Sequence, residues 1–184
     1  MDHNSRNESV PHNTEDKNWW LLHGVGLENR FIRICNEKLN LDALINPEKK
    51  NNPYAPDLIV NKRIADLKTQ NTPFFTSTRY KIEPRFAVTF NRKDYERYKT
   101  LYPDIDIYFW VDWIQTEWRG IKVDYLGGIF TLPFKSVQEI IENENAPEHH
   151  YMQRVNDNAG NAKSSFILDI RSFHKLFATK KRIY

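Results

Sequence analysis

Two aspartates and a lysine in the segment 55–70 have the types and the spacing of a site for a divalent cation. Eight residues separate Asp57 from Asp66, and Lys68 follows Asp66 after one more residue. Two carboxylates that face each other repel unless a cation lies between them. Magnesium binds proteins through one or two carboxylates together with water and substrate phosphate. The three residues therefore indicate a magnesium site, provided that the fold brings the two aspartates together.

The segment that carries these residues has the pattern of a β-hairpin. Two apolar, partly β-branched runs, 58–60 and 64–67, flank a polar pair of turn residues. If the turn has two residues, Asp57 faces Asp66. Because side chains alternate along a strand, Asp66 and Lys68 then share one face. A turn that is one residue longer would take the two aspartates out of direct opposition.

Plainer interpretations exist for each candidate residue. The hairpin could lie on the surface, with Asp57 capping a turn and with Asp66 and Lys68 as solvated charges. Glu28 lies in the first turn of a predicted helix, where the helix dipole favours a carboxylate. Gln70 shares a face with Lys68, but a strand-end amide is often satisfied by backbone groups alone. The position of both aspartates on one predicted hairpin favours the cation site over the surface hairpin.

Composition limits the class of protein. The chain has 184 residues, of which 40% are hydrophobic and 14% aromatic, and this is enough for one globular domain with a core. The net charge of +3 permits a polyanionic partner without requiring one. Cys35 is the only cysteine, which excludes an internal disulfide and suits a reducing compartment. No apolar run approaches a membrane span and the N-terminus is polar, so we expect a cytoplasmic protein without a membrane partner.

Helices and strands are both expected around the hairpin. Residues 1–18 are polar and aperiodic, which predicts a disordered or loosely docked tail, and residues 19–184 are predicted to form a single domain. The segment 41–45 is compatible with a short strand or with an extra helical turn. Before the hairpin, a turn or helix start is predicted at 23–26 and a helix over 27–39. After it come extended segments over 74–76 and 80–82, a strand over 86–90, a helix over 92–102 capped by Asn91 and an alternating strand over 104–113. The last predicted elements are a hairpin of 121–126 and 129–132 around Gly127-Gly128, a helix opening at Ser136, a strand over 166–170 and a helix-compatible segment over 173–178.

The string Pro56-Asp57, eight residues, Asp66-Leu67-Lys68 resembles the PD-(D/E)XK motif of the restriction-endonuclease-like nuclease superfamily. A helix carrying the acid Glu28 precedes this string, and a helix and an alternating strand follow it, in the order of the family. The resemblance covers about residues 19–113 and leaves about 114–184 as a C-terminal addition of β-hairpin and helix. It implies an α/β (α+β) fold with a mixed central sheet of four or more strands flanked by helices.

Two features depart from the family pattern. The strand expected between the acid-bearing helix and Asp57 is weak, because only 41–45 is available for it. The spacing between Asp57 and Asp66 is at the short end of the family range. The first departure leaves the order of the strands open.

The resemblance implies a magnesium-dependent nuclease that hydrolyses DNA phosphodiester bonds, with Mn²⁺ as a substitute metal. Asp57 and Asp66 would hold the ion, the backbone carbonyl of Leu67 would be a third ligand, and Glu28 would act through a bound water or a second ion. Lys68, next to two carboxylates, should remain protonated and orient the attacking water rather than act as a base. Gln70 would bind that water or a phosphate oxygen.

The expected substrate is DNA, with double-stranded DNA favoured over single-stranded DNA, and the enzyme would be of a restriction type or from a phage or mobile element. By resemblance, a homodimer is also expected. The basic residues that we associate with nucleic-acid binding are Arg92, Lys93, Arg97, Arg154 and Lys163. One alternative is a non-cleaving nucleic-acid-binding or assembly module on the same fold. Another is a glycosidase with paired carboxylates, which the neighbouring Lys68 disfavours.

Overall fold

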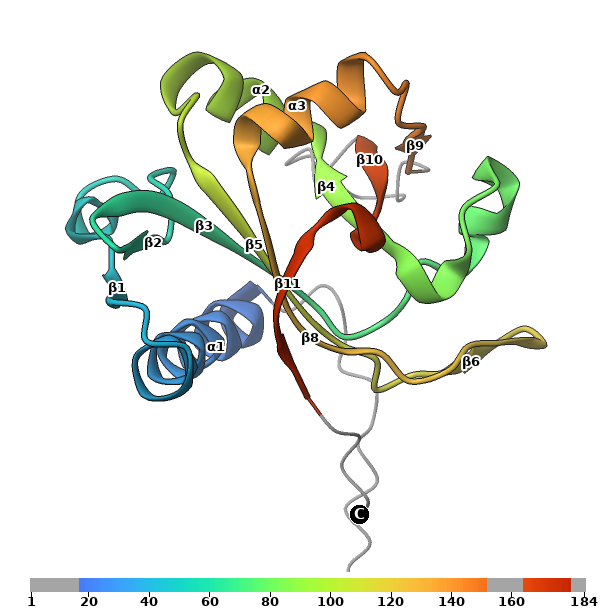
Figure 1. Cartoon of the computed structure of the whole chain (residues 1–184), viewed down its shortest axis with the longest axis horizontal. Coiled ribbons are helices and arrows are strands. Elements are labelled where there is room, and N and C mark those ends of the chain that lie inside the picture. Colours follow the sequence, from blue (N-terminus) through green and yellow to red (C-terminus); the bar gives the residue numbers. More distant parts are fainter. Residues whose placement is uncertain (1–16, 152–163, 180–184) are drawn as a thin grey trace, which may run out of the picture.

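A six-stranded mixed sheet forms the centre of the protein (Figure 1). The computed structural model describes residues 17–151 and 164–179, with side chains from Gly26 onward. Along the sheet the strands are β1 (Ala43–Ile45), β2 (Leu58–Val60), β3 (Arg63–Gln70), β5 (Asp106–Asp112), β8 (Gly127–Pro133) and β11 (His174–Ala178). Neighbouring strands are antiparallel except for β3 and β5, which are parallel. The predicted α/β class with a mixed sheet of at least four strands is confirmed.

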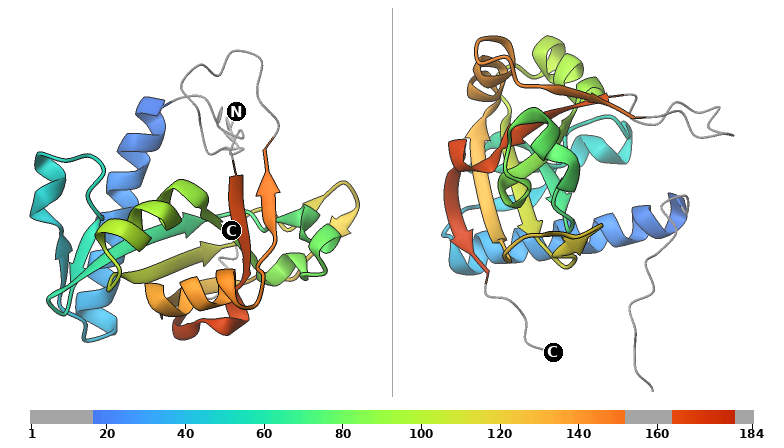
Figure 2. Two further views of the ribbon diagram at one scale, coloured as in Figure 1. Left: turned by 90° about the horizontal axis from the view of Figure 1, so that it is seen from above. Right: turned by 90° about the vertical axis from the view of Figure 1, so that its right-hand side faces the viewer.

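Helix α1 (Lys17–Lys38) packs on one face of this sheet (Figures 1 and 2). Its buried Phe31 and Cys35 contact a hydrophobic cluster that includes Leu67 and Tyr108. Burial raises the pKa of the Cys35 thiol to about 12. Within 17–151 and 164–179, no helix combines the length and the apolar character that a membrane crossing requires.

The opposite face of the sheet is covered by two helices and a small second sheet (Figures 1 and 2). These elements are α2 (Arg92–Leu101), α3 (Phe134–Glu142), β4 (Ala87–Asn91), β10 (Ser164–Asp169) and β9 (Glu148–His150). Aromatic side chains dominate this core, because Phe90, Tyr98, Phe109 and Phe134 are fully or almost fully buried together. Strand β5 therefore has buried residues on both faces, although its sequence alternates between apolar and more polar residues.

The hairpin β2–β3 has the two-residue turn that was predicted. Leu58 pairs with Ala65 and Val60 pairs with Arg63. The turn residues Asn61 and Lys62 have φ angles of 48° and 66°. Positive φ at both central residues is the geometry that matches the twist of two antiparallel strands.

Three further predictions in the first half of the chain can be compared with the structure. Asn91 caps α2, since its side chain accepts a hydrogen bond from the backbone nitrogen of Lys93. The segment 41–45, which was left open, contains the strand β1 and pairs with β2. The segments 74–76 and 80–82 were predicted as extended, which is wrong, because 75–80 form a 3₁₀ helix.

The predicted start of the first helix is also wrong. Helix α1 begins at Lys17, so residues 23–26, which were predicted as a turn or a helix start, lie inside the helix with their two glycines. Each glycine costs a helix about 1 kcal/mol relative to alanine, and this cost does not end the helix here. The predicted polar tail overlaps the helix at residues 17 and 18, and its residues 1–16 lie outside the described part of the chain.

The predicted turn at Gly127-Gly128 is wrong as well. Both glycines lie inside β8, and a Cβ atom on Gly128 would approach the backbone oxygen of Phe177 to 2.3 Å. The glycines therefore permit β11 to lie close to β8. The nearby hairpin instead joins β6 (Glu117–Trp118) to β7 (Ile121–Lys122), with its turn at residues 119–120.

Two other predictions fail beyond residue 130. The segment 173–178 was predicted as helix-compatible but forms β11, which pairs with β8 through a register shift. Helix α3 begins at Phe134, directly after Pro133, and not at Ser136. The remaining short 3₁₀ helices are Pro47–Lys50, Pro84–Phe86 and Ile170–Ser172, in addition to Phe75–Tyr80.

Candidate functional site

The hairpin brings the two predicted metal ligands together. Asp66 lies on β3 and is buried, with 3% of its surface exposed, whereas Asp57 lies directly before β2 and is half-buried. An oxygen of Asp57 accepts a hydrogen bond of 3.3 Å from the backbone nitrogen of Leu67, the residue after Asp66. Burial and the negative charge of Asp66 raise the pKa of Asp57 to about 6. Two acids of unlike proton affinity therefore lie side by side at this point.

Lys68 connects β3 to α2. Its Nζ atom lies 2.7 Å from Oδ2 of Asp66 and 2.6 Å from Oδ2 of Asp94. Burial alone would lower the pKa of Lys68, but the charges of Asp66 and Asp94 raise it well above its usual value. Lys68 is thus an ammonium at neutral pH, which agrees with the sequence argument that it orients groups rather than acts as a base.

Burial also opposes the ionisation of Asp66. The ammonium of Lys68 and a hydrogen bond from Tyr98 outweigh burial and hold the pKa of Asp66 below its usual value. A hydrogen bond between the carboxyl groups of Asp57 and Asp66 contributes in the same direction. Asp66 is therefore the acid of the pair that remains ionised, and Asp57 is the one that is more easily protonated.

Helix α2 adds three residues to the site that sequence reasoning did not assign to it. Asp94, in the first turn of α2, accepts from Lys68 through one oxygen and from Arg97 Nη2 through the other, at 2.7 Å. Arg97 also donates to the hydroxyl of Tyr98, at 3.2 Å. Arg97 and Tyr98 lie three and four positions after Asp94, so both are neighbours of Asp94 on the surface of the helix. This spacing was the only sequence signal available, and it does not show which strand these residues contact.

Glu28 reaches the site through a lysine that the sequence did not single out. Nζ of Lys49 lies 2.9 Å from Oε1 of Glu28 and 2.6 Å from Oδ1 of Asp57. Lys49 belongs to the 3₁₀ helix Pro47–Lys50, in a stretch that reads as an ordinary charged loop. The sequence gives no signal that separates Lys49 from the adjacent Lys50.

These residues form a row of alternating charge. Lys49 lies between Glu28 and Asp57, and Lys68 lies between Asp66 and Asp94, which also binds Arg97. The alternation is interrupted only where Asp57 adjoins Asp66. In the described residues 17–151 and 164–179, no three His, Cys, Asp or Glu side chains form a group arranged to hold a metal. Within the described residues, the carboxylate pair of the hairpin is therefore the candidate for holding a metal.

A pair of carboxylates nevertheless fits magnesium, which commonly takes one or two carboxylates and completes its shell with water and phosphate. Oδ2 of Asp66 is buried and accepts no well-directed hydrogen bond, although Lys68 is close to it. Such an oxygen retains a lone pair that can coordinate a metal ion. Asp57 and Asp66 would hold the ion, with Leu67 adjacent to both.

Gln70 occupies the place that its plainer interpretation predicts. Its Nε2 atom donates to the backbone oxygen and to Oγ1 of Thr89 on β4, both at 2.9 Å. The amide nitrogen is therefore used to join β3 to β4. The structure does not bring Gln70 into the row of alternating charge.

The three predicted nucleic-acid-binding residues that the structure describes all lie on α2 but have different surroundings. Arg92 donates to Glu148 at 2.7 Å, and Lys93 is exposed in the first turn of α2. Arg97 is turned inward to Asp94. Arg154 and Lys163 lie outside the described residues.

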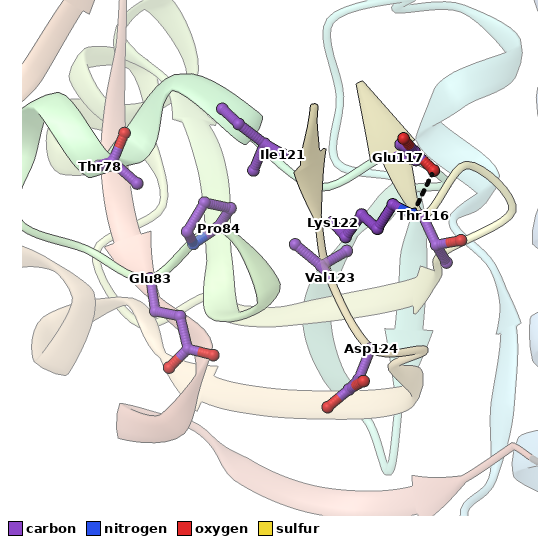
Figure 3. Close-up of a pocket in the computed structure, with 9 residues that line it drawn as sticks. All are labelled: Thr78, Glu83, Pro84, Thr116, Glu117, Ile121, Lys122, Val123 and Asp124. Atoms are coloured by element: carbon purple, nitrogen blue, oxygen red, sulfur yellow. Dashed lines mark ion pairs between the residues drawn. The ribbon is translucent and has the colours of Figure 1, made fainter. Parts of the chain in front are cut away.

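A cavity of about 440 Å³ lies elsewhere in the molecule (Figure 3). Its lining comes from the segment 78–84 and from the hairpin β6–β7 with the residues beside it, and it includes the ion pair of Lys122 with Glu117 at 3.5 Å. None of the residues in the row of alternating charge lines this cavity.

Comparison of the chain with protein-family models, with curated proteins and with solved structures yields no match. The chemistry of the row of alternating charge is therefore the basis on which a function can be argued.

Proposed function

We propose that this protein is a magnesium-dependent nuclease that hydrolyses phosphodiester bonds in DNA. The observation that carries the proposal is the meeting of Asp57 and Asp66 across the hairpin, with the ammonium of Lys68 2.7 Å from Asp66. An acid pair that is flanked by an ammonium suits a substrate that brings its own negative charge together with a divalent cation.

Each residue has a role that its surroundings support. Asp66 is held ionised by Lys68, so it is the stronger anionic ligand, and Asp57 is the second ligand. Lys68 stays protonated, is fixed by Asp94, and orients the attacking water while it neutralises a phosphate oxygen. When bound, the metal would activate water and stabilise the charge that develops on the phosphate.

The order of the elements supports the same proposal. A helix carrying Glu28 comes first, and the antiparallel strands β1, β2 and β3 follow it. Helix α2 then leads to β5, which runs parallel to β3. The PD-(D/E)XK resemblance implies a helix, a hairpin with the acids, a second helix and a further strand in this order.

Several finer points belong to the proposal through that resemblance. The substrate would be double-stranded DNA in preference to single-stranded DNA, Mn²⁺ would substitute for Mg²⁺, and the enzyme would be of a restriction, phage or mobile-element type. Two copies of the chain would cut the two strands, so a homodimer is the proposed working form. A cytoplasmic location is proposed as well.

The test is a cleavage assay with plasmid, linear and single-stranded DNA, with Mg²⁺, with Mn²⁺ or with chelator. We expect cleavage that requires the metal and that falls at least about a hundredfold in Asp66→Asn. Asp124→Asn is the matched control, because the side chain of Asp124 is 85% exposed and lies outside the site. Undiminished cleavage by Asp66→Asn would refute the site assignment.

A second candidate is a non-cleaving nucleic-acid-binding or assembly module. The observation that favours it is that Asp57 and Asp66 each already have a lysine ammonium, at 2.6 Å and 2.7 Å. The same samples distinguish the two functions, because a binding module retards DNA in a gel without cutting it under any metal condition.

A further inference from the structure

The contacts of Lys49 differ from those of an ordinary surface lysine. Its ammonium lies between two carboxylates that come from different parts of the chain, Glu28 on α1 and Asp57 before β2. The three side chains are only partly accessible, with 25%, 16% and 21% of their surfaces exposed in the order Lys49, Glu28, Asp57. Lys49 is thus enclosed by both acids.

The backbone around Lys49 is fastened to the segment that carries Asp57. Asn46, which is buried, caps the 3₁₀ helix Pro47–Lys50 by accepting from the backbone nitrogen of Glu48. Its side chain also donates to the oxygen of Pro56 at 2.9 Å, and its backbone nitrogen donates to the oxygen of Asp57 at 3.0 Å. These bonds fix the position of the Lys49 ammonium relative to the carboxylate of Asp57.

Both carboxylate oxygens of Asp57 are in use. Oδ1 accepts from Lys49 at 2.6 Å, and Oδ2 accepts from the backbone nitrogen of Leu67 at 3.3 Å. The bond from Leu67 belongs to the hairpin itself. A divalent cation that binds Asp57 through Oδ1 must therefore take the place of the Lys49 ammonium.

We propose that Lys49 is a built-in competitor of the divalent cation, occupying Glu28 and Asp57 when the metal is absent and leaving them when the metal binds. This inference rests on the proposed function, because it concerns the same metal site. Without a cation, Glu28, Asp57 and Asp66 would repel one another, and Lys49 offsets that repulsion. With the metal bound, the ammonium is expelled from Asp57 by like charge and is free to meet a phosphate of the substrate.

The experiment measures Mn²⁺ affinity by calorimetry and by electron paramagnetic resonance on the full chain without DNA. We expect Lys49→Met to bind Mn²⁺ at least about tenfold more tightly than the wild type, since a neighbouring positive charge has been removed. Lys49→Arg should stay close to the wild type because it retains the charge. Lys50→Met is the matched control, because Lys50 is the exposed neighbour on the same 3₁₀ helix, and its affinity should not change.

A second measurement uses the unaltered protein, so it does not depend on how well a variant folds. Reductive methylation with mass spectrometry reports how accessible each lysine is. We expect Mn²⁺ to raise the rate of modification at Lys49 severalfold and to leave Lys50 unchanged. In Asp57→Asn the metal should have no effect on Lys49.

The outcomes separate this inference from the proposed function. If Mn²⁺ binds in a manner that depends on Asp57 and Asp66, but Lys49→Met binds it no more tightly and methylation of Lys49 does not respond, the competition is refuted and the metal site stands. If no binding depends on Asp57 and Asp66, the metal site of the proposed function is refuted together with the competition.

Discussion

Two lysines hold the acids of the candidate site, and different parts of the molecule hold the two lysines. Lys68 extends from the central strand β3 and lies against the rings of Phe90 and Tyr98, at 5.9 Å and 5.6 Å from their centres. Lys49 extends from a 3₁₀ helix at the edge of the fold. The ammonium of Lys68 thus faces two aromatic rings of the core, whereas that of Lys49 lies between two carboxylates, although the two side chains are similarly exposed, at 20% and 25%.

Lys68 and Lys49 have similar ion-pair distances, but these do not imply similar roles. Removing Lys68 would leave Asp66 unpaired in a buried position, and an uncompensated buried charge is costly. Removing Lys49 would leave Asp57 with its bond from Leu67 and with access to water. We therefore regard Lys68 as a fixed part of the site and Lys49 as the exchangeable part. The following predictions test this division.

The largest effect is expected at the fixed lysine. Lys68→Met should lower the free energy of unfolding by about 3–5 kcal/mol, because Asp66 and Asp94 lose their shared ammonium. Urea denaturation followed by circular dichroism measures the change. Lys99→Met is the control, since Lys99 on α2 forms an exposed ion pair with Glu142 on α3, and it should change stability little. Equal losses in both variants would contradict the division.

A gain of stability is expected at Asp57. Its pKa of about 6 in the folded protein lies above its value of 3.8 in an unperturbed chain, so the folded state binds the proton more tightly. The contribution of Asp57 to stability is therefore full below pH 4 and falls as the pH rises through 4 to 6. Asp57→Asn cannot ionise at this position, so it does not lose stability as the pH rises. It should be more stable than the wild type by about 1–3 kcal/mol at pH 7.5 without divalent metal.

The pH dependence provides the control for that prediction. The two proteins should differ little at pH 3, where Asp57 is largely protonated in both the folded state, with its pKa of about 6, and the unfolded state, with a pKa of 3.8. Thermal unfolding over this range of pH measures the difference. A stability difference that does not vary with pH would show that Asp57 does not titrate as described.

A smaller loss is expected from the residue that positions Lys49. Asn46→Ala removes the helix cap and the bond to Pro56 and should cost about 1–2 kcal/mol. In the same variant, methylation of Lys49 without metal should become faster, because the loop no longer holds the ammonium on Asp57. Stability loss with unchanged Lys49 modification would mean that Asn46 supports the fold but does not position Lys49.

The smallest effect on stability is expected at Lys49 itself. Lys49→Met should cost at most about 1 kcal/mol in the absence of metal, as is usual for partly exposed ion pairs. Lys50→Met should cost nothing measurable. A loss at Lys49 as large as that at Lys68 would remove the distinction between the two lysines.

The local pattern of the sequence was sufficient to predict the hairpin and its acids. A two-residue turn between the apolar runs 58–60 and 64–67 gives the register that places Asp57 opposite Asp66, and the observed pairs agree with it. The cap at Asn91 and the helix that follows were equally local features. The hairpin, the cap and the helix each depend on residues that lie only a few positions apart in the sequence.

Predictions that depend on distant partners failed. The segment 173–178 has no strong strand signal of its own, and it becomes β11 because β8 offers an edge and close contact at Gly128. Lys49 and Asp94 could not be assigned to the site, because Lys49 lies in a segment that reads as a loop, 8 positions from Asp57 and 21 from Glu28, and Asp94 lies 26 positions from Lys68. The sequence thus predicted that Asp57 and Asp66 lie together, but not that Lys49 and Asp94 lie on either side of them.

The two-residue turn at 61–62 also bears on the order in which the site assembles during folding. A hairpin closes within about 1–10 μs, whereas pairing of distant strands requires a longer loop to close and is slower. Asp57 and Asp66 would then meet before α2 brings Asp94 or the N-terminal helix brings Glu28. Because Lys68 lies on the same hairpin as Asp66, the nascent acid pair has its neutralising charge from the first moment of contact.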